Sequence, residues 1–273
     1  MCGIVGYIGQ HQAYPILING LKRLEYRGYD SAGIALLDDE SHLKVYKAKG
    51  KVSNLEALVT SRDVTAHLGI AHTRWATHGE PSECNAHPHC SASGRYALVH
   101  NGIIENYLAL KDILVAKGYQ FQSDTDTEVL VQFIDYICNI RSVDLLMGMR
   151  IALQSVVGAY AIAVIDRMNP RQIIVARKSS PLVVGIGEEE YFLSSDVTPL
   201  VNYTNQVVYL NDEEIAVINL DNGLKVENIH EEVVNPDIKT IDVEISQLEK
   251  GAYPHYMLKE IFEQPDCLVN CMR

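Results

Sequence analysis

The stretch MCGIVGYIGQ, residues 1–10, places a cysteine directly behind the initiator methionine and ahead of a run of apolar residues. Residues 3–8 predict a buried strand. Chain termini usually fray, so a reactive thiol at the start of a chain needs a reason. One interpretation makes Cys2 a small apolar residue at the head of that strand. The other removes Met1, so that Cys2 becomes the first residue and carries a thiol and a free α-amine on one carbon.

The second interpretation gives Cys2 a chemical role. A free cysteine thiol has a pKa near ~8.5 and is mostly protonated at neutral pH, so a nucleophilic cysteine needs a base. An α-amine has an unperturbed pKa of roughly 7.7–8.0, and it can take the thiol proton directly or through a water molecule. Position 2 alone does not decide between the two interpretations.

The composition of the chain excludes several classes of protein. Of its 273 residues, 47% are hydrophobic, which suffices for a full core and argues against a disordered chain. A net charge of −12 without a Lys/Arg cluster argues against nucleic-acid binding. We find no signal peptide and no apolar run near the ~18 residues of a membrane span. We therefore expect a cytoplasmic protein whose six cysteines are free thiols.

The hydrophobic pattern predicts strands on both sides of a group of helices. Expected helices cover 15–26, 53–60, 104–118, 126–139 and 142–156, and expected strands cover 3–8, 31–37, 43–49, 67–72 and 95–102. From residue 159 the sequence changes to short strands at close spacing, joined by polar turns. This order suggests two sheets with helices packed on them.

Two short motifs between these elements could carry chemistry. In HNG, residues 100–102, the Asn101 amide and the Gly102 N–H could stabilise an oxyanion, although an Asn-Gly turn is the commoner use of this pair. In HTRWATHGE, Arg74 could bind a carboxylate and Trp75 could act as a lid, or both could be ordinary surface residues. Each motif is weak by itself.

Two further segments suggest no cofactor. The segment CNAHPHC, residues 84–90, is rich in potential metal ligands, but its spacing does not match the usual zinc patterns, so we expect no metal. The acidic residues of DTDTE, 124–128, suit the start of a helix, and one of them could pair with a substrate ammonium. Because no nucleotide-binding motif is visible, we expect no cofactor.

Six motifs, taken in order, resemble one family. MCGIVGYIG, RGYDSAGIA, AHTRWATHGEPS, NAHPH, VHNGIIEN and SDTDTEV resemble the glutaminase domains of glutamine–fructose-6-phosphate amidotransferases, which are class II glutamine amidotransferases. The resemblance implies an α+β fold, the N-terminal nucleophile (Ntn) hydrolase sandwich. In that fold two antiparallel sheets lie between helical layers in the order αββα.

The resemblance also implies a mechanism. Cys2, exposed by removal of Met1, would attack the side-chain amide of L-glutamine, release ammonia and form a thioester that water converts to glutamate. Asn101 and Gly102 would form the oxyanion hole, and Arg27 would hold the region around the nucleophile.

A glutamine pocket follows from the same resemblance. Its expected residues are Arg74, Trp75, Thr77, His78, His87 and Asp126. Arg74 would bind the α-carboxylate and Asp126 the α-ammonium. Trp75 would lie on a mobile loop that closes over glutamine, and His87 would support that loop.

The sequence predicts three parts. Residues 1–228 would form the glutaminase domain and residues 229–254 a linker. Residues 255–273, which contain a short helix at 255–266, would begin a sugar isomerase (SIS) region. In the full-length enzyme, expected to be a homodimer, the isomerase domains would use the ammonia to convert fructose 6-phosphate to glucosamine 6-phosphate, in UDP-GlcNAc biosynthesis.

Two alternatives to this function stay open. The acceptor of the ammonia could be that of a purine-pathway phosphoribosyl amidotransferase or of an asparagine synthetase, since both share the glutaminase chemistry. The domain could also be a non-catalytic glutamine-sensing module on the same fold.

Overall fold

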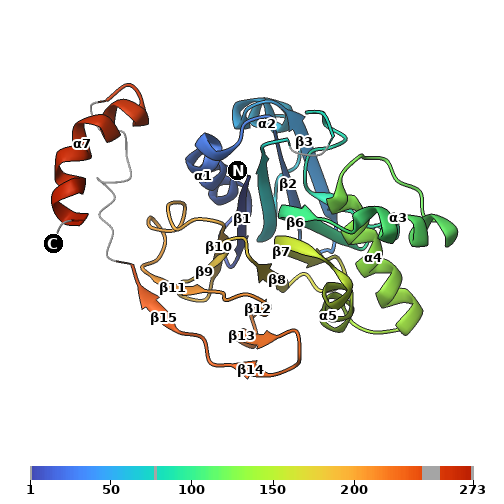
Figure 1. The fold of residues 1–273 in the computed structure, drawn as a ribbon. Helices are drawn as coiled ribbons and strands as arrows, with labels where there is room; N and C mark the ends of the chain where they lie inside the picture. The colour runs from blue at the N-terminus through green and yellow to red at the C-terminus, as the bar shows by residue number, and fades with distance from the viewer. Residues whose placement is uncertain (1, 77–78, 242–252, 272–273) are drawn as a thin grey trace. The chain divides into compact units, whose positions relative to one another are not determined.

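The computed structural model describes residues 2–76, 79–241 and 253–271. The chain forms two compact units, one ending at Thr240 and the other beginning at Ile241 (Figure 1). All the sheets belong to the first unit.

Two antiparallel sheets form the centre of the first unit. The first sheet has the order β15 (Ile238–Thr240), β11 (Gln206–Tyr209), β9 (Val183–Ile186), β10 (Tyr191–Ser194), β1 (Gly3–Ile8), β4 (Leu68–Arg74), β2 (Ser31–Leu37) and β3 (Leu43–Lys49). The second has the order β14 (Val233–Val234), β13 (Gly223–Asn228), β12 (Glu214–Asn219), β8 (Gln172–Lys178), β7 (Gly158–Asp166), β6 (Tyr96–Ile104) and β5 (His89–Cys90).

Helices cover the outer faces of both sheets. Helices α1 (Ala13–Leu24) and α2 (Val52–Val59) pack on strands of the first sheet, and a 3₁₀ turn at Glu25–Arg27 follows α1. Helices α3 (Tyr107–Ala116), α4 (Asp126–Arg141) and α5 (Leu145–Ser155) form a group against the second sheet. Figure 1 shows the two helical groups on opposite sides of the sheets. The predicted αββα sandwich is confirmed.

Side chains along the strands of the second sheet point alternately to its two faces, and this alternation divides the core into two layers. In β6, Leu98 packs with the apolar residues of α3–α5, whereas Ala97 and Val99 face the cluster that includes Ile4 and Ile70 of the first sheet. Successive side chains of a strand point to opposite faces, so one strand supplies both layers. Small residues on the inner face bring the two sheets close together.

The position of β1 fixes where the chain begins. The strand lies between β10 and β4, and every one of its residues is buried. Its predicted bounds, 3–8, are those of the structure. Cys2 therefore leads directly into a strand in the interior of the larger sheet.

The segment after residue 228 differs from the prediction. Residues 229–254 were expected to be a linker, yet β14 pairs with β13 and β15 pairs with β11. β14 forms a short hairpin with the preceding strand, whereas β15 pairs with a strand from earlier in the chain, and the polar composition of this segment concealed both. The first compact unit accordingly reaches Thr240.

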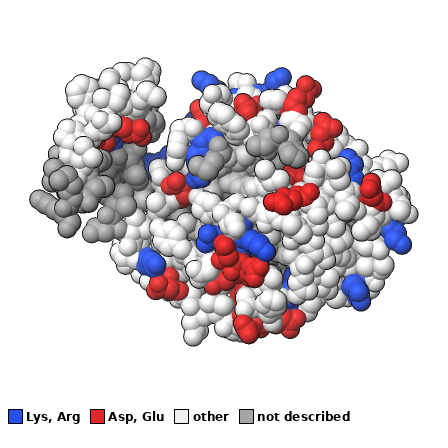
Figure 2. Space-filling model, viewed as in Figure 1, with Lys and Arg blue, Asp and Glu red and all other residues white. Residues whose placement is uncertain are grey.

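The described part of the second unit contains one helix, α7 (Tyr256–Cys271). The helix was predicted at 255–266, but it continues past Pro265, a residue that removes one backbone hydrogen bond from a helix interior. Within the described residues, no helix is long and apolar enough to cross a membrane. Acidic and basic groups intermingle on the face shown in Figure 2.

Candidate active site

The strand register brings the start of the chain to the end of β4. Gly3 of β1 pairs with Thr73 of β4, so Cys2 comes beside Arg74. The Trp75 N–H donates to the Cys2 Sγ at 3.3 Å, and the thiol lies 3.5 Å from the Trp75 carbonyl oxygen. These two contacts position the sulfur against the residue that follows Arg74.

The Cys2 thiol lies in a partly buried environment. Burial raises the pKa of this thiol, while the Trp75 N–H and the charges of Arg74 and Arg27 oppose the rise in part. A thiol with a raised pKa stays protonated at neutral pH, so its reaction as a nucleophile requires a base. Met1, whose removal would supply an α-amine at Cys2, lies outside the described residues.

Asn101 and Gly102 of β6 lie next to the start of β1. The Asn101 Nδ2 donates to the Cys2 carbonyl oxygen at 3.3 Å. Gly102 has φ +132°, and a Cβ added there would come within 2.0 Å of the Ala159 carbonyl oxygen on β7. The close approach and the positive φ both require glycine at this position.

A residue that the sequence analysis missed holds the Asn101 amide. The Nε2 of His72 lies 3.1 Å from the His100 carbonyl oxygen and 3.0 Å from the Asn101 Oδ1. A carbonyl oxygen only accepts hydrogen bonds, so this Nε2 carries a proton and donates it. Because the Oδ1 faces His72, the Nδ2 of Asn101 must face Cys2. In the sequence, His72 was only one polar residue in an apolar strand.

Three further histidines surround His72. Its ring stacks on that of His87 at 4.2 Å between centroids, and His87 meets His89 edge to face at 5.1 Å. The His87 Nδ1 accepts the His100 N–H at 3.3 Å. Burial lowers the pKa of His72 to about 3, and it also lowers the pKa values of His87, His89 and His100. All four rings are therefore neutral at neutral pH.

Arg74 and Asp126 provide charges of opposite sign. The Arg74 guanidinium is buried and donates to the carbonyl oxygens of Gly79 at 3.2 Å and Glu80 at 3.4 Å. Burial lowers the pKa of this guanidinium, and the Cys2 sulfur, when ionised, and the carboxylates of Asp126 and Asp30 act against that change. Asp126 is the first residue of α4, and its Oδ2 accepts the Ile104 N–H at 2.8 Å. That contact ties the start of the helix to β6.

One cavity of about 20 Å³ joins these groups. Its lining residues are Cys2, Arg74, Trp75, His87, His100, Gly102, Thr125, Asp126 and Thr127. The volume has room for about one water molecule. A thiol, a guanidinium and a carboxylate thus meet at a small cavity that would have to widen for an amino acid.

The other residues that the sequence predicts for the site either lie around this cavity or are not among the described residues. Arg27 donates to the Ser195 carbonyl oxygen at 3.2 Å and to the Asp196 Oδ2 at 3.4 Å. Since Ser195 in turn hydrogen-bonds both backbone groups of Ile4, Arg27 acts on β1 through Ser195. Trp75 is 46% exposed and lies edge to face with Tyr29. Thr77 and His78 lie outside the described residues.

Among the described residues, no group of three or more His, Cys, Asp or Glu side chains is arranged to hold a metal ion. The cysteines Cys2, Cys84, Cys90 and Cys138 are free thiols.

Comparison with known proteins gives consistent matches. The model of a glutamine amidotransferase domain family matches residues 58–260. A glutamine–fructose-6-phosphate aminotransferase (isomerizing) of Bacteroides thetaiotaomicron is 63% identical over 273 residues, and one of Chlorobaculum tepidum is 52% identical over 279 residues. All of this chain is covered in both cases, but only 44% and 45% of those proteins. The chain thus spans less than half the length of these relatives.

Solved structures show a similar arrangement. A glutamine phosphoribosylpyrophosphate amidotransferase of B. subtilis, complexed with ADP and GMP, has a TM-score of 0.71 at 28% identity. The match covers 85% of this chain and 50% of that one. A class-II glutamine aminotransferase domain protein of Silicibacter pomeroyi shares the fold, with a TM-score of 0.52 at 17% identity, over 83% of this chain and 99% of its own.

Proposed function

The chain belongs to the glutamine amidotransferase domain family, and we propose from this that it hydrolyses L-glutamine to L-glutamate and ammonia, with Cys2 as the nucleophile. The cavity that Cys2 shares with Arg74, Gly102 and Asp126 carries the proposal. It combines a thiol with one group for each charge of a free amino acid.

The first half of the reaction forms a thioester. After removal of Met1, the α-amine of Cys2 takes the thiol proton while the sulfur attacks the amide carbon of glutamine. The carbonyl electron pair moves to oxygen and gives a tetrahedral oxyanion. When that intermediate collapses, the C–N bond breaks, and the α-ammonium returns its proton to the leaving nitrogen. Ammonia departs and a γ-glutamyl thioester remains.

The second half regenerates the thiol. The α-amine takes a proton from water, and the hydroxyl oxygen bonds to the thioester carbon. The C–S bond then breaks to release glutamate, and the α-ammonium returns its proton to the departing sulfur. Both halves pass through an oxyanion at one position. The Nδ2 of Asn101, held by His72, and the N–H of Gly102 are the proposed donors to it.

Substrate binding uses the opposite charges in the cavity. Arg74 would bind the α-carboxylate through paired hydrogen bonds, and Asp126 would bind the α-ammonium. Thr77 and His78 would complete the pocket. The closed cavity has room for about one water molecule, so glutamine entry requires the segment that carries Trp75 to move. His87, stacked on His72, would support the wall behind that segment.

A covalent label tests this function. The chain is incubated with a diazoketone analogue of glutamine, and its intact mass is measured before and after. We expect a starting mass that lacks one methionine, one adduct per chain, and a peptide map that assigns the adduct to Cys2. Excess glutamine should slow the labelling, since both compete for one pocket.

Two variants complete this experiment. Cys2→Ser should take no adduct, whereas Cys84→Ser, which changes an exposed thiol, should label like the unchanged chain. A processed chain that takes no adduct, or takes it at Cys84 or Cys90, would exclude Cys2 as the nucleophile. Glutamine binding without glutamate release would instead support a sensing module.

The longer protein would use the ammonia. We propose that it converts fructose 6-phosphate to glucosamine 6-phosphate, as a cytoplasmic homodimer whose isomerase domains follow this chain. The names and identities of the two relatives favour this acceptor over the phosphoribosyl one. Residues 255–273 would begin the isomerase region. The free thiols of the described residues support a reducing compartment.

A further inference from the structure

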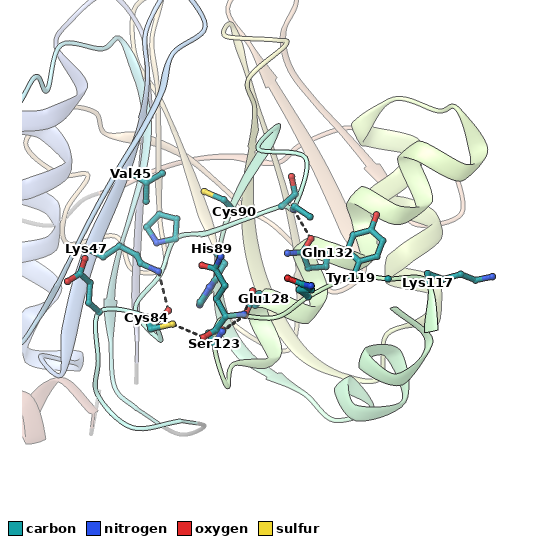
Figure 3. Close-up of a pocket in the computed structure, with 17 residues that line it drawn as sticks. Val45, Lys47, Cys84, His89, Cys90, Lys117, Tyr119, Ser123, Glu128 and Gln132 are labelled. Atoms are coloured by element: carbon teal, nitrogen blue, oxygen red, sulfur yellow. Dashed lines mark hydrogen bonds between the residues drawn. The ribbon is translucent and has the colours of Figure 1, made fainter. Parts of the chain in front are cut away.

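A second, larger groove lies on the far side of the histidine cluster from Cys2. Its volume is about 980 Å³, within the range of small-molecule sites. Val45 and Lys47 of β3 form one wall, and Lys117 and Tyr119, just after α3, lie on the other side (Figure 3). The floor includes His89 and Ser123. None of the groups in the proposed glutaminase reaction lines this groove.

Lys47 presents a cation to the groove without a matching anion. Its Nζ donates to the Cys84 carbonyl oxygen at 3.2 Å, and Figure 3 shows the side chain pointing into the space. Among the described residues it forms no salt bridge, whereas its neighbour Lys44 contacts Asp38 at 3.0 Å and Asp63 at 2.6 Å. Burial lowers the pKa of Lys47. Such a group gains most from an anionic ligand.

The acidic residues of the groove form no ion pair with Lys47, although the charges of Glu128 and Glu83 partly oppose the fall of its pKa. Glu128 is buried, and its carboxylate accepts hydrogen bonds from the N–H groups of Gln122 and Ser123 and from the Ser123 hydroxyl. Those donors occupy both of its oxygens. Glu83 is exposed at the rim.

We propose that this groove binds a small molecule through an anionic phosphate or carboxylate group. That group would form an ion pair with the Lys47 ammonium. The polar side chains and backbone around it would contact the rest of the ligand. Binding at this site does not depend on the proposed glutaminase activity.

Hydrogen bonds connect the groove to the proposed glutamine site. The Cys84 thiol donates to the Gln122 carbonyl oxygen at 2.8 Å. Next to Cys84, the Asn85 Nδ2 donates to the Glu80 carbonyl oxygen at 3.1 Å, the oxygen that also accepts from Arg74. A ligand that draws Lys47 away from Cys84 would therefore disturb the segment that holds Arg74. This coupling, unlike the binding, rests on the proposed function.

Binding is measured by calorimetry on the whole chain. The probes are inorganic phosphate and citrate, each titrated at an ionic strength fixed with chloride, in the presence of glutamate to occupy the other site. We expect Lys47→Gln to weaken the tighter probe by about tenfold or more, because a hydrogen bond to a charged group is lost. If phosphate binds more tightly than citrate, the site prefers a phosphate group. If citrate binds more tightly, the site prefers a carboxylate group.

Two control variants separate a specific contact from folding or general charge. Lys49→Gln removes the same charge from an exposed position two residues along β3, and it should bind like the unchanged chain. Lys47→Arg keeps the charge and should retain most of the affinity. If neither probe binds the unchanged chain, or if Lys47→Gln binds as well as Lys49→Gln, the proposed site is wrong.

The coupling has its own readout in Trp75, the single tryptophan of the chain. Its fluorescence should change during the titration with the midpoint found by calorimetry, and this change should be absent in Lys47→Gln. Binding without any change in Trp75 emission would overturn the coupling and leave the site intact. Failure of Cys2 labelling would overturn the glutaminase proposal without affecting the calorimetry.

Discussion

The orientation of the Asn101 side-chain amide determines whether Cys2, the proposed nucleophile, faces a hydrogen-bond donor or an acceptor. The His100 carbonyl oxygen fixes the proton of His72 on Nε2, and that proton fixes the Asn101 Oδ1. The pKa of His72, about 3, keeps the ring neutral over the working range of an enzyme. His72 is thus a positioning residue that acts through Asn101.

Replacing His72 tests this role. His72→Phe keeps a flat ring in the stack with His87 but removes the donor, so the Asn101 amide loses its fixed orientation. We expect kcat for glutamine hydrolysis to fall by roughly 10²–10³, the effect of losing an oxyanion donor, with little change in KM. Steady-state glutamate release measures both constants.

His72→Gln serves as the matched variant, because its amide can donate to the Asn101 Oδ1. It should recover a large part of the lost kcat. Equal losses of kcat in both variants, or a loss confined to KM, would contradict a positioning role.

The sequence identified most of the residues around the cavity but not their supports. Cys2, Arg74 and Asp126 stand in motifs whose residue types suit the chemistry, and the structure brings them to one cavity. His72 and Thr127 act through contacts between strands and helices that are distant in sequence. Nothing within the local sequence marks such a partner.

The backbones of β6 and β7 lie close together at position 102, and this close approach limits which residue can occupy that position. Gly102→Ala combines a positive φ with a Cβ that would lie 2.0 Å from the Ala159 carbonyl oxygen. The strand must shift, so we expect a loss of about 1–3 kcal/mol or more in the free energy of unfolding. Urea denaturation measures it, and Cys2 labelling should slow in the same variant.

Gly94→Ala is the control for backbone strain alone. Gly94 also has a positive φ, +67°, but a Cβ there would meet nothing within 4 Å. A cost for Gly94→Ala as large as that for Gly102→Ala would show that φ, and not the approach to Ala159, is responsible.

The histidine cluster where β4, β5 and β6 meet predicts a dependence of stability on pH. Burial lowers the pKa of His72, His87, His89 and His100 in the folded protein, so the unfolded chain binds protons first as pH falls. Their stabilisation is complete above the unfolded pKa of about 6.5 and is lost below it. Together they should lower the free energy of unfolding by on the order of 5 kcal/mol per pH unit below about pH 6.

Denaturation in urea at a series of pH values measures this slope. His89→Gln should reduce it by about one quarter, since one of four protons is removed. The exposed His42, replaced by Gln, is the control and should leave the slope unchanged. A slope that is the same in His89→Gln would exclude His89 as a contributor.

Helices and strands could be predicted where the hydrophobic pattern of the sequence is strong. They could not be predicted where a short strand depends on pairing with another strand. The short apolar run of residues 3–8 sufficed for β1, and three helices were expected where α3, α4 and α5 lie. The polar stretch after residue 228 gave no sign of β14 and β15, because each short strand depends on a partner already present in a sheet.

At the scale of the molecule, the first compact unit should fold alone. A chain of residues 1–241 keeps both sheets and every described residue of the glutamine site, so we expect its melting temperature and its Cys2 labelling to match those of the whole chain. A chain of residues 1–228 loses β14 and β15, so β11 and β13 become edge strands that each keep one partner, β9 and β12. Its melting temperature should fall by several degrees, at about 2–4 °C per kcal/mol for a domain of this size.

Thermal unfolding followed by circular dichroism compares the two chains. If the 1–228 chain melts at the same temperature as the 1–241 chain, the two strands contribute nothing and the domain ends where the sequence analysis predicted. If the 1–241 chain is unstable, the second unit is needed for folding.

The central place of β1 has a consequence for synthesis. Cys2 is among the first residues to emerge from the ribosome. The strand that follows it, β1, lies between β4 and β10, and β10 ends only at Ser194. Cys2, the proposed nucleophile, is therefore part of an incomplete sheet until some 190 further residues have emerged. At ordinary rates of translation, this takes about 10–40 s. In the proposed mechanism a peptidase could remove Met1 during that interval, whereas any tag fused ahead of Met1 would leave the Cys2 thiol without its amine.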